Sequence, residues 1–209
     1  AEKVDFTLAV GGGSIIDGTK FITAAMNYDG DPWDFIVGKA PVPAAKPFGT
    51  VLTLPATGSE MNCGAVISRR ATKEKYAFHN AKGFPQFSVL DPMAVFSLPK
   101  RQIANGIIDT FIHTTEQYLT TAGSPMVMDR FAEGVLLTLT DIAPRLLADG
   151  ERAYDDCANF MMAATMGLNG FLAMGVDEDW ATHMIGHELT ALHGLDHGVT
   201  LAIVWPGTM

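Results

Sequence analysis

The sequence changes character near residue 98, and this change limits the folds that the chain can adopt. Before it, short apolar segments rich in β-branched residues alternate with helical spacing and with glycine- and proline-rich stretches. After it, long segments with helical spacing follow one another, and no alternating strand pattern is present. The sequence therefore predicts an α/β part over residues 1–98, followed by an all-helical part over residues 99–209.

The first part contains four segments with the composition of strands and one with helical spacing. The helical segment runs from Ile15 to Met26, and its apolar residues can form one buried stripe: Ile15, Ile16, Phe21, Ile22 and Ala25. Glycine and proline crowd the stretch Gly30–Gly49, which we expect to be loop. The expected strands are Phe6–Val10, Thr50–Leu54, Ala65–Ser68 and Phe87–Leu90.

The second part has four segments with the spacing of helices. One of them includes an uncharged run, Asn159–Val176, which contains polar residues and glycines. We expect a buried helix there and not a membrane span, which needs about 20 predominantly apolar residues. The expected helices are Gln102–Thr121, Pro125–Asp149, Arg152–Met174 and Asp179–Leu192.

Charge and cysteine content exclude some classes of partner. With 14 Lys and Arg against 23 Asp and Glu, the formal charge of −9 disfavours binding to nucleic acid or to an anionic membrane. The two cysteines, Cys63 and Cys157, cannot build a disulfide framework and fit a reducing compartment. We therefore expect a cytoplasmic protein without a nucleic-acid or membrane partner.

Two loops have the composition of nucleotide-binding segments. Gly11-Gly-Gly-Ser14 lies between a strand and a helix, where backbone N–H groups and the helix N-terminus can hold a phosphate. It departs from the G-x-G-x-x-G fingerprint because Ile16 occupies the third glycine position. The segment Thr53–Asn62 carries hydroxyl and amide side chains between two strand candidates. Both loops also fit ordinary turns, so composition alone leaves phosphate binding open.

The histidines indicate a metal site. Five of the six lie in the helical part, where His113 follows Asp109 by four residues, so that both side chains project from one helix face. The other four fall within fifteen residues: His183, His187, His193 and His197. A carboxylate with two or three imidazoles from different helices suits Fe(II) or Zn(II), with one position left open for a substrate oxygen.

The zinc-protease motifs do not occur. H-E-x-x-H requires a histidine where Ala191 stands, and the inverted H-x-x-E-H requires a glutamate where Gly186 stands. A closed structural zinc site does not fit either, because the two cysteines are distant in sequence from each other and from the histidines. The residues therefore favour an open metal site.

Five motifs occur in the order that is found in one enzyme family. They are Gly11-Gly-Gly-Ser14 with Asp17, Leu54-Pro-Ala-Thr-Gly-Ser-Glu60, Leu90-Asp-Pro92, Gly106-Ile-Ile-Asp-Thr-Phe-Ile-His113, and the segment from His183 to His197. On these residues the chain resembles the iron-dependent (group III) alcohol dehydrogenases, in particular the branch of NADPH-dependent butanol dehydrogenases and aldehyde reductases. The resemblance covers essentially the whole chain.

The resemblance implies roles for individual residues. His187 would be the catalytic residue, near the nicotinamide and the substrate, with a role in proton transfer. The metal ligands would be Asp109, His113, His183 and His197. The contacts with the cofactor would come from Gly12, Gly13, Ser14, Asp17, Thr53, Thr57, Ser59, Asn62 and Lys75. Of these, Lys75 also fits an exposed charged hairpin over residues 69–75.

The resemblance also implies an activity, which is the interconversion of primary alcohols and aldehydes by metal-dependent hydride transfer with NAD(P)H. The expected metal is Fe(II), with Zn(II) as the alternative, and the expected cofactor is NADPH, with NADH as the alternative. A Rossmann-like, incomplete α/β part with a parallel sheet would hold the cofactor, and the helical part would carry the metal. We expect a homodimer or a larger homo-oligomer.

Relatives in the family have a strand–helix unit before the position of Ala1 and further helices after that of Met209, so we expect this sequence to be the central part of the family fold. Two other functions stay open. One is a truncated, catalytically silent metal-binding fragment that persists by oligomerisation. The other is a metal-dependent lyase or synthase on the same scaffold, as in dehydroquinate synthases, although those are expected to use a ligand set other than Asp109 and His113.

Overall fold

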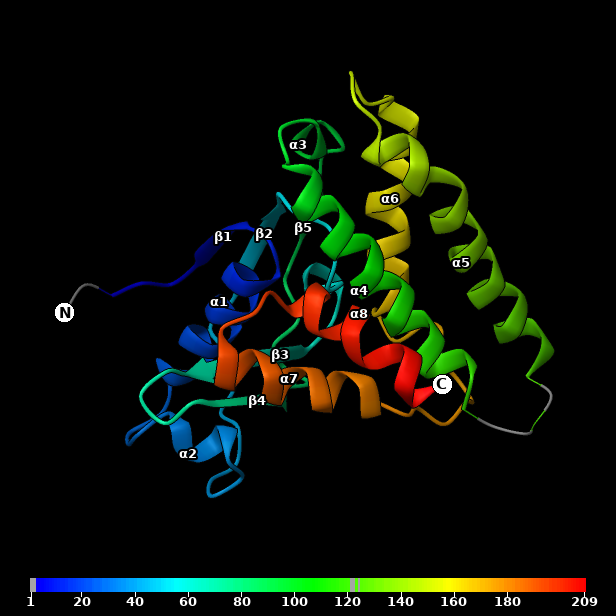
Figure 1. The fold of residues 1–209 in the computed structure, drawn as a ribbon. Coiled ribbons are helices and arrows are strands. Elements are labelled where there is room, and N and C mark those ends of the chain that lie inside the picture. Colours follow the sequence, from blue (N-terminus) through cyan, green and yellow to red (C-terminus); the bar gives the residue numbers. More distant parts are fainter. Residues whose placement is uncertain (1–2, 121–122, 124) are drawn as a thin grey trace.

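The computed structural model describes residues 3–120, 123 and 125–209. In these residues a parallel sheet has the strand order β1-β2-β5, with β1 at Thr7–Gly11, β2 at Phe48–Leu52 and β5 at Ser88–Leu90 (Figure 1). Helix α1 (Gly13–Ala25) begins directly after β1 and packs against it. The predicted α/β part with a parallel sheet is confirmed.

The third predicted strand, Ala65–Ser68, lies outside this sheet. It forms β3 (Gly64–Arg69), which pairs in antiparallel fashion with β4 (Glu74–His79), a strand that the sequence pattern does not predict. Helix α2 (Trp33–Ile36) lies in the stretch predicted to be loop. The prediction is wrong there because the apolar side chains of this short helix pack into a small core with the hairpin.

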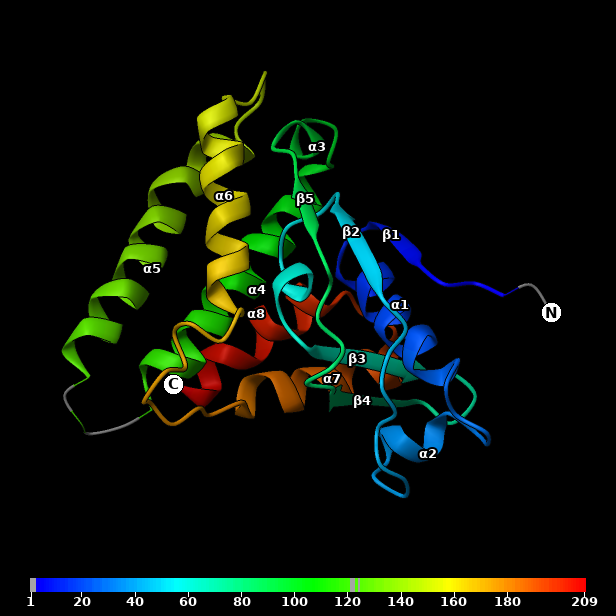
Figure 2. The same cartoon turned by 180° about the vertical axis from the view of Figure 1, so that it is seen from behind.

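The second half of the described chain is helical, as predicted. Its elements are α3 (Met93–Phe96), α4 (Lys100–Tyr118), α5 (Met126–Leu147), α6 (Tyr154–Gly167), α7 (Ala181–His193) and α8 (His197–Thr208). Helix α4 runs through the centre of this half and packs against α5, α6, α7 and α8 (Figures 1 and 2). None of the helices in the described ranges is long and apolar enough to cross a membrane.

Two features of the helices differ from the sequence prediction. The helix expected to reach Met174 ends earlier, as α6, because the backbone leaves the helical conformation at Leu168, with a φ of −143°, and then turns at Gly170, whose φ of +86° lies in the left-handed region. The pattern does not predict α8, since this helix is apolar on nearly all sides and contains Pro206. The predicted end of α4 at Thr121 lies outside the described residues.

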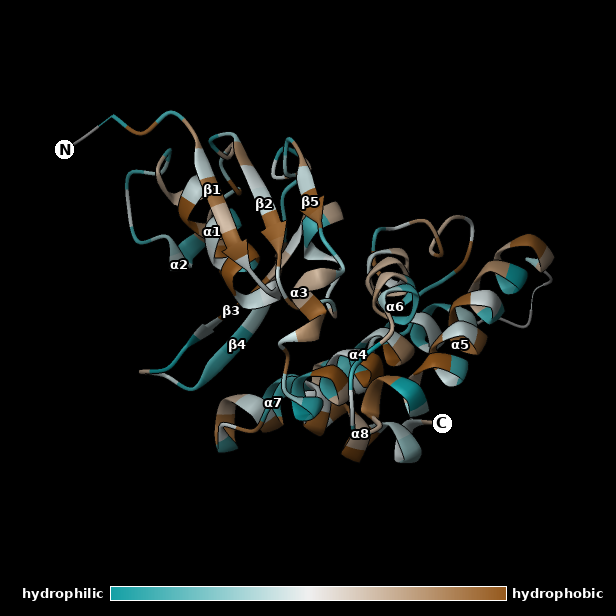
Figure 3. Cartoon of the chain, turned by 90° about the horizontal axis from the view of Figure 1, so that it is seen from above, coloured by the Kyte–Doolittle hydropathy of each residue, from teal (hydrophilic) through white to brown (hydrophobic). Residues whose placement is uncertain are grey.

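One apolar core joins the two halves of the chain. Ile16 of α1 and Leu52 of β2 share this core with Phe160 of α6, and all three are fully buried. Seen from above, β1 and β2 point toward the helical half (Figure 3). Gly106 of α4 lies against the loop that follows β2, where a β-carbon would stand 2.4 Å from the carbonyl oxygen of Pro55. A side chain at this glycine would therefore force the two halves apart.

The buried face of α1 is partly polar, which corrects two positions, Ile15 and Ile22, of the apolar stripe predicted for it. Ile15 and Ile22 are 53% and 55% exposed, whereas Lys20 is buried. The Lys20 ammonium donates hydrogen bonds to Ser59 Oγ (2.8 Å), to Asn62 Oδ1 (2.8 Å) and to a backbone carbonyl of β3 (2.7 Å). This part of the face is polar because the hydrogen-bond partners of Lys20 come from the loop after β2 and from the β3–β4 hairpin.

Asp17 completes this Lys20 network. Its Oδ1 accepts a hydrogen bond from Ser59 Oγ at 2.6 Å, and its Oδ2 accepts one from the backbone N–H of Val66 at 2.8 Å. Burial lowers the pKa of Lys20 to about 8 and raises the pKa of Asp17. Burial of both charges is costly, so each depends on the other for its stability.

We expect Lys20→Met to lower the free energy of unfolding by about 3 kcal/mol, because it leaves the Asp17 carboxylate buried without a counter-charge. Urea denaturation followed by circular dichroism measures the change. Lys82→Met, at an exposed lysine, is the matched control and should change stability by less than about 0.5 kcal/mol. Equal stability of the two variants would show that the network does not hold α1 in place.

Candidate metal centre and its surroundings

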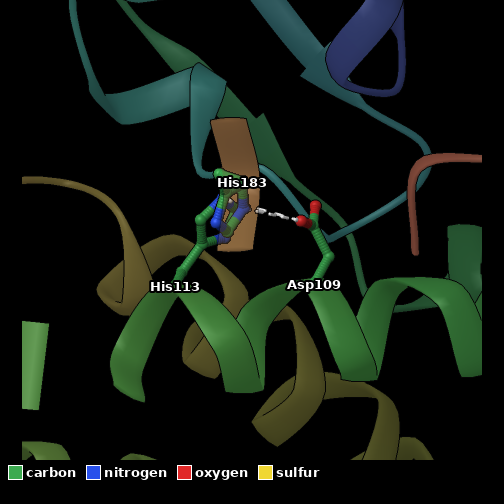
Figure 4. Close-up of side chains that lie close together, drawn as sticks. All are labelled: Asp109, His113 and His183. Atoms are coloured by element: carbon green, nitrogen blue, oxygen red, sulfur yellow. Dashed lines mark ion pairs between the residues drawn. The ribbon is translucent and has the colours of Figure 1, made fainter. Parts of the chain in front are cut away.

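Asp109 and His113 lie one turn apart on α4 and project from the same side of the helix (Figure 4). They are only 3% and 4% exposed. His183 of α7 lies against them, with its ring stacked on that of His113 at a centroid distance of 4.4 Å. The pair that the sequence places on one helix face is thus joined by a histidine from a second helix.

A glycine turn brings a fourth candidate to the same place. Gly194 ends α7 with a φ of +68°, and α8 begins at His197. Asp196, the residue before α8, accepts a hydrogen bond from Asn105 Nδ2 of α4 at 3.0 Å and forms an ion pair with Arg101 at 2.8 Å. These contacts hold the start of α8 against α4, so that His197 lies beside the carboxylate.

Three imidazoles surround one carboxylate oxygen. The Nε2 atoms of His113, His183 and His197 lie 3.6, 3.5 and 3.6 Å from Oδ1 of Asp109. Asp109, His113 and His183 offer donor atoms that all lie within 4.8 Å of one another. Asp109 Oδ1 and His183 Nε2 are buried, with no hydrogen-bond partner in the part of the chain that the structure describes. Converging donor atoms of this kind fit a metal cation.

The electrostatics favour the metal-binding protonation states of Asp109, His113 and His197, and the protonated form of His183. Burial would raise the pKa of Asp109, but the imidazoles of His113, His183 and His197 hold it well below its ordinary value. Burial lowers the pKa of His113 to about 4 and brings that of His197 well below its ordinary value. Burial also opposes charge on His183, yet two carboxylates, Asp109 and Glu116, raise its pKa. An ionised carboxylate and neutral imidazoles are the forms that coordinate metals.

Glu116 belongs to this centre, although no sequence motif singles it out. It lies on α4 one turn beyond His113, it is buried, and its Oε2 contacts Nδ1 of His183. The signal that could have revealed it is the spacing of Asp109, His113 and Glu116 at i, i+4 and i+7, which places all three on one helix face.

His187 lies at the edge of the centre, one turn after His183 on α7. Its ring centroid lies 5.0 Å from that of His197, and the side chain is buried. Burial, with the positive charge of Lys75 next, lowers the pKa of His187 to about 3. His193, by contrast, is exposed and takes no part in the cluster.

Lys75 is half-buried on β4, because this strand packs against α7. The charged hairpin suggested by the sequence exists, but this side chain is not on its exposed side. Burial lowers the pKa of Lys75 to about 8, and the carboxylates of Asp109 and Asp17 partly offset that shift. The amino group therefore interacts electrostatically with both the α4 carboxylate and the polar face of α1.

The glycine turn and the loop after β2 lie side by side at the carboxyl ends of β1 and β2. The N-cap of α1 is Gly12, and a β-carbon at Gly13 would stand 2.5 Å from the side chain of Thr57. The backbone N–H of Thr53 donates to the last residue of β1 at 3.0 Å, and Ser14 is exposed in the first turn of α1. Helix N-termini at this edge of a parallel sheet are suited to phosphate.

The remaining predicted cofactor contacts have partners inside the protein. Asp17, Ser59 and Asn62 lie near the glycine turn, but their side chains belong to the Lys20 network. Asn62 Nδ2 also donates to the carbonyl oxygen of Leu168, at 3.0 Å, and thereby ties this loop to the end of α6. The structure therefore brings these residues together chiefly as a support for the turn.

Known proteins resemble this chain over its whole length. It is 58% identical over 208 residues to the NADPH-dependent aldehyde reductase YqhD of Escherichia coli (strain K12). This alignment covers 98% of this chain and 54% of that protein. It is 45% identical over 208 residues to the probable NADH-dependent butanol dehydrogenase 1 of Bacillus subtilis (strain 168), covering 100% of this chain and 54% of the relative. The chain thus spans about half the length of these curated relatives.

The fold agrees with the sequence comparison. A crystal structure of Escherichia coli K-12 YqhD matches with a TM-score of 0.95 and 57% identity, over 98% of this chain and 53% of that one. The family model described as iron-containing alcohol dehydrogenase matches residues 1–92. The model described as the C-terminal part of the Fe-containing alcohol dehydrogenase family matches residues 103–209. The two models together match nearly the whole sequence, and the chain belongs to the iron-containing alcohol dehydrogenase family.

Proposed function

We propose that this chain, alone or as part of a longer protein, reduces aldehydes and oxidises primary alcohols with NADPH. The observation that carries the proposal is the buried Asp109 carboxylate, with three imidazole nitrogen atoms 3.5 to 3.6 Å from one of its oxygens. The printed names of the relatives, an aldehyde reductase and a butanol dehydrogenase, support the substrate class.

We assign the metal to residues 99–209. Its proposed ligands are Asp109, His113, His183 and His197, a set of oxygen and nitrogen donors that suits Fe(II), with Zn(II) as the alternative. When bound, a divalent metal supplies Lewis acidity toward a carbonyl or alcohol oxygen, and a nicotinamide supplies the hydride chemistry. The chain itself supplies an ionised carboxylate, converging imidazoles and a site from which water is largely excluded.

We assign the cofactor to residues 1–98, with NADPH preferred and NADH as the alternative. The first turn of α1, at Gly12, Gly13 and Ser14, offers backbone N–H groups to the pyrophosphate. The hydroxyl side chains of Thr53 and Thr57 belong to the neighbouring loop and can extend the same contact. We propose that Asp17, Ser59 and Asn62 act on the cofactor mainly by holding this turn and loop in place.

His187 and Lys75 are proposed to act on the substrate and the nicotinamide side. Because the pKa of His187 is about 3, its ring is neutral at physiological pH and can accept a hydrogen bond from an alcohol or a water. The amino group of Lys75, with a pKa of about 8, is mainly protonated at pH 7 and places a positive charge nearby. We propose the cytoplasm as the location, since Cys63 and Cys157 are free thiols.

A silent metal-binding chain that persists by oligomerisation is the second candidate. The observation that favours it is an apolar sheet face: Leu8 and Val10 of β1 and Val89 of β5 are 51%, 56% and 45% exposed. Such a face favours association with a further polypeptide. A homodimer or larger homo-oligomer could cover this apolar face, whether the chain is an active enzyme or a silent metal-binding chain.

For the metal site, we expect His197→Ala to lose the bound metal, because one of the four proposed donors is removed. Elemental analysis of protein purified and reconstituted with Fe(II) or Zn(II) measures the stoichiometry. The control is His193→Ala, at the exposed histidine of the same segment, which should keep about one metal per chain, as the parent does. Full occupancy in the His197 variant would contradict the ligand assignment.

For the cofactor site, we expect Ser14→Asp to weaken NADPH binding by about tenfold or more, because it sets a negative charge beside the pyrophosphate. An acidic residue in the first turn stabilises a helix, so this variant should stay folded. Ser14→Asn has a similar shape without the charge, and is the control. Titration of NADPH fluorescence measures both variants, and equal affinities would place the phosphates elsewhere.

For the activity, we expect the metal-loaded chain to oxidise NADPH in the presence of butanal, and the rate to disappear after treatment with a chelator. The absorbance of NADPH measures the rate. Metal and NADPH binding without turnover would support the silent candidate instead. Turnover that survives complete metal removal would contradict the metal-dependent mechanism.

A further inference from the structure

We propose that Glu116 is a positioning residue of the metal centre, whose carboxylate holds the His183 ring in the one tautomer that turns an unprotonated Nε2 toward Asp109. The proposal deepens the proposed function and rests on it, because it concerns how this chain prepares a ligand. It is carried by the contacts that one buried carboxylate makes with the backbone and with a side chain of α7.

Glu116 is placed for this role by the spacing along α4. It follows Asp109 by seven residues and His113 by three, so all three side chains project from the same face of the helix. The Glu116 side chain is as enclosed as its neighbours, with a residue exposure of 7%. A carboxylate buried to this extent needs hydrogen-bond donors around it.

The first set of donors is the backbone at the start of α7. The N–H groups in the first turn of a helix have no partner within the helix. Trp180 stands at the N-cap of α7, but its side chain makes no capping hydrogen bond with the helix backbone. Instead, Glu116 Oε1 accepts the N–H groups of Thr182 and His183, at 2.6 and 3.3 Å. The backbone carbonyl of Glu116 also accepts the N–H of Asp179, at 2.9 Å.

The second donor is the His183 ring. Glu116 Oε2 contacts Nδ1 of His183, and an ionised carboxylate can only accept a hydrogen bond. In the neutral ring, Nδ1 therefore carries the proton, and Nε2 is left with a free lone pair. This Nε2 is the atom that lies 3.5 Å from Asp109 Oδ1. The carboxylate thus fixes both the rotation of the ring and the nitrogen that is available to a cation.

The His197 ring, by contrast, has no carboxylate that holds its Nδ1 within the part of the chain that the structure describes. Its Nδ1 is buried and has no hydrogen-bond partner among the described residues. His183 is therefore the candidate ligand whose tautomer a protein carboxylate dictates.

Glu116→Gln tests the tautomer separately from the backbone contacts. The amide oxygen of glutamine can still accept the two N–H groups of α7, whereas its amide NH₂ donates to Nδ1 of His183. The proton of the ring is then driven to Nε2, where it faces Asp109 and blocks coordination. Glu188→Gln, at an exposed position of α7, makes the same change of charge away from the contact with His183 Nδ1 and is the control.

Two measurements test the proposal, one without metal and one with it. At a pH where the ring is neutral, the ¹⁵N chemical shifts of His183 in the metal-free chain should report a proton on Nδ1 alone in the parent and on Nε2 alone in Glu116→Gln. Competition with a chromophoric chelator should show that Zn(II) binds about 10- to 100-fold more weakly to Glu116→Gln, and equally well to Glu188→Gln. Circular dichroism confirms that each variant is folded.

The outcomes separate this proposal from the proposed function. A parent chain whose metal-free His183 is protonated at Nε2 would overturn the role of Glu116, as would parental Zn(II) affinity in a folded Glu116→Gln variant. A parent that binds no Zn(II) at all, but shows the protonated Nδ1, would overturn the metal site while leaving the contact between Glu116 and His183 established. Because the tautomer is read in the parent, the test does not depend on the folding of any variant.

Discussion

The ionised carboxylate of Asp109 is the constraint on which the helical half of the molecule depends. A charge buried to this extent is costly unless it is compensated, and the described residues place three imidazoles within 3.6 Å of it. Neutral rings compensate it only in part, since they carry dipoles and no net charge. A divalent cation at the point where helices α4, α7 and α8 converge would complete the compensation.

The two halves of the chain meet so closely that neither site is independent of the other. Gly106 of α4 lies against the loop after β2, three residues before Asp109, and allows no side chain between the halves. Lys75 of the hairpin interacts electrostatically with Asp17 on one side and with Asp109 on the other. A change in the packing of α1 would therefore alter the electrostatic environment of Asp109, although no residue of α1 belongs to the candidate metal centre.

The sequence predicts the parts of this structure that depend on local spacing. The pair Asp109 and His113 is predictable because both lie on one helix, and the glycine turn because it directly follows a strand. Lys20 and Glu116 are not predictable in this way, since their partners lie 39 and 66 residues away in the sequence. Strand β4 escapes detection because charged and aromatic side chains mask its alternation, and α8 because it lacks a polar face.

The left-handed turn at Gly194 has a consequence for how the protein unfolds. By returning the chain to α4, it would let the proposed cation join segments that are distant in sequence, from Asp109 to His197. Such a cross-link acts on the folded state, and interactions that form after the folding transition state mainly slow unfolding. Loss of the cation would then show itself first as faster digestion by a protease at the α7–α8 connection, before the rest of the fold is affected.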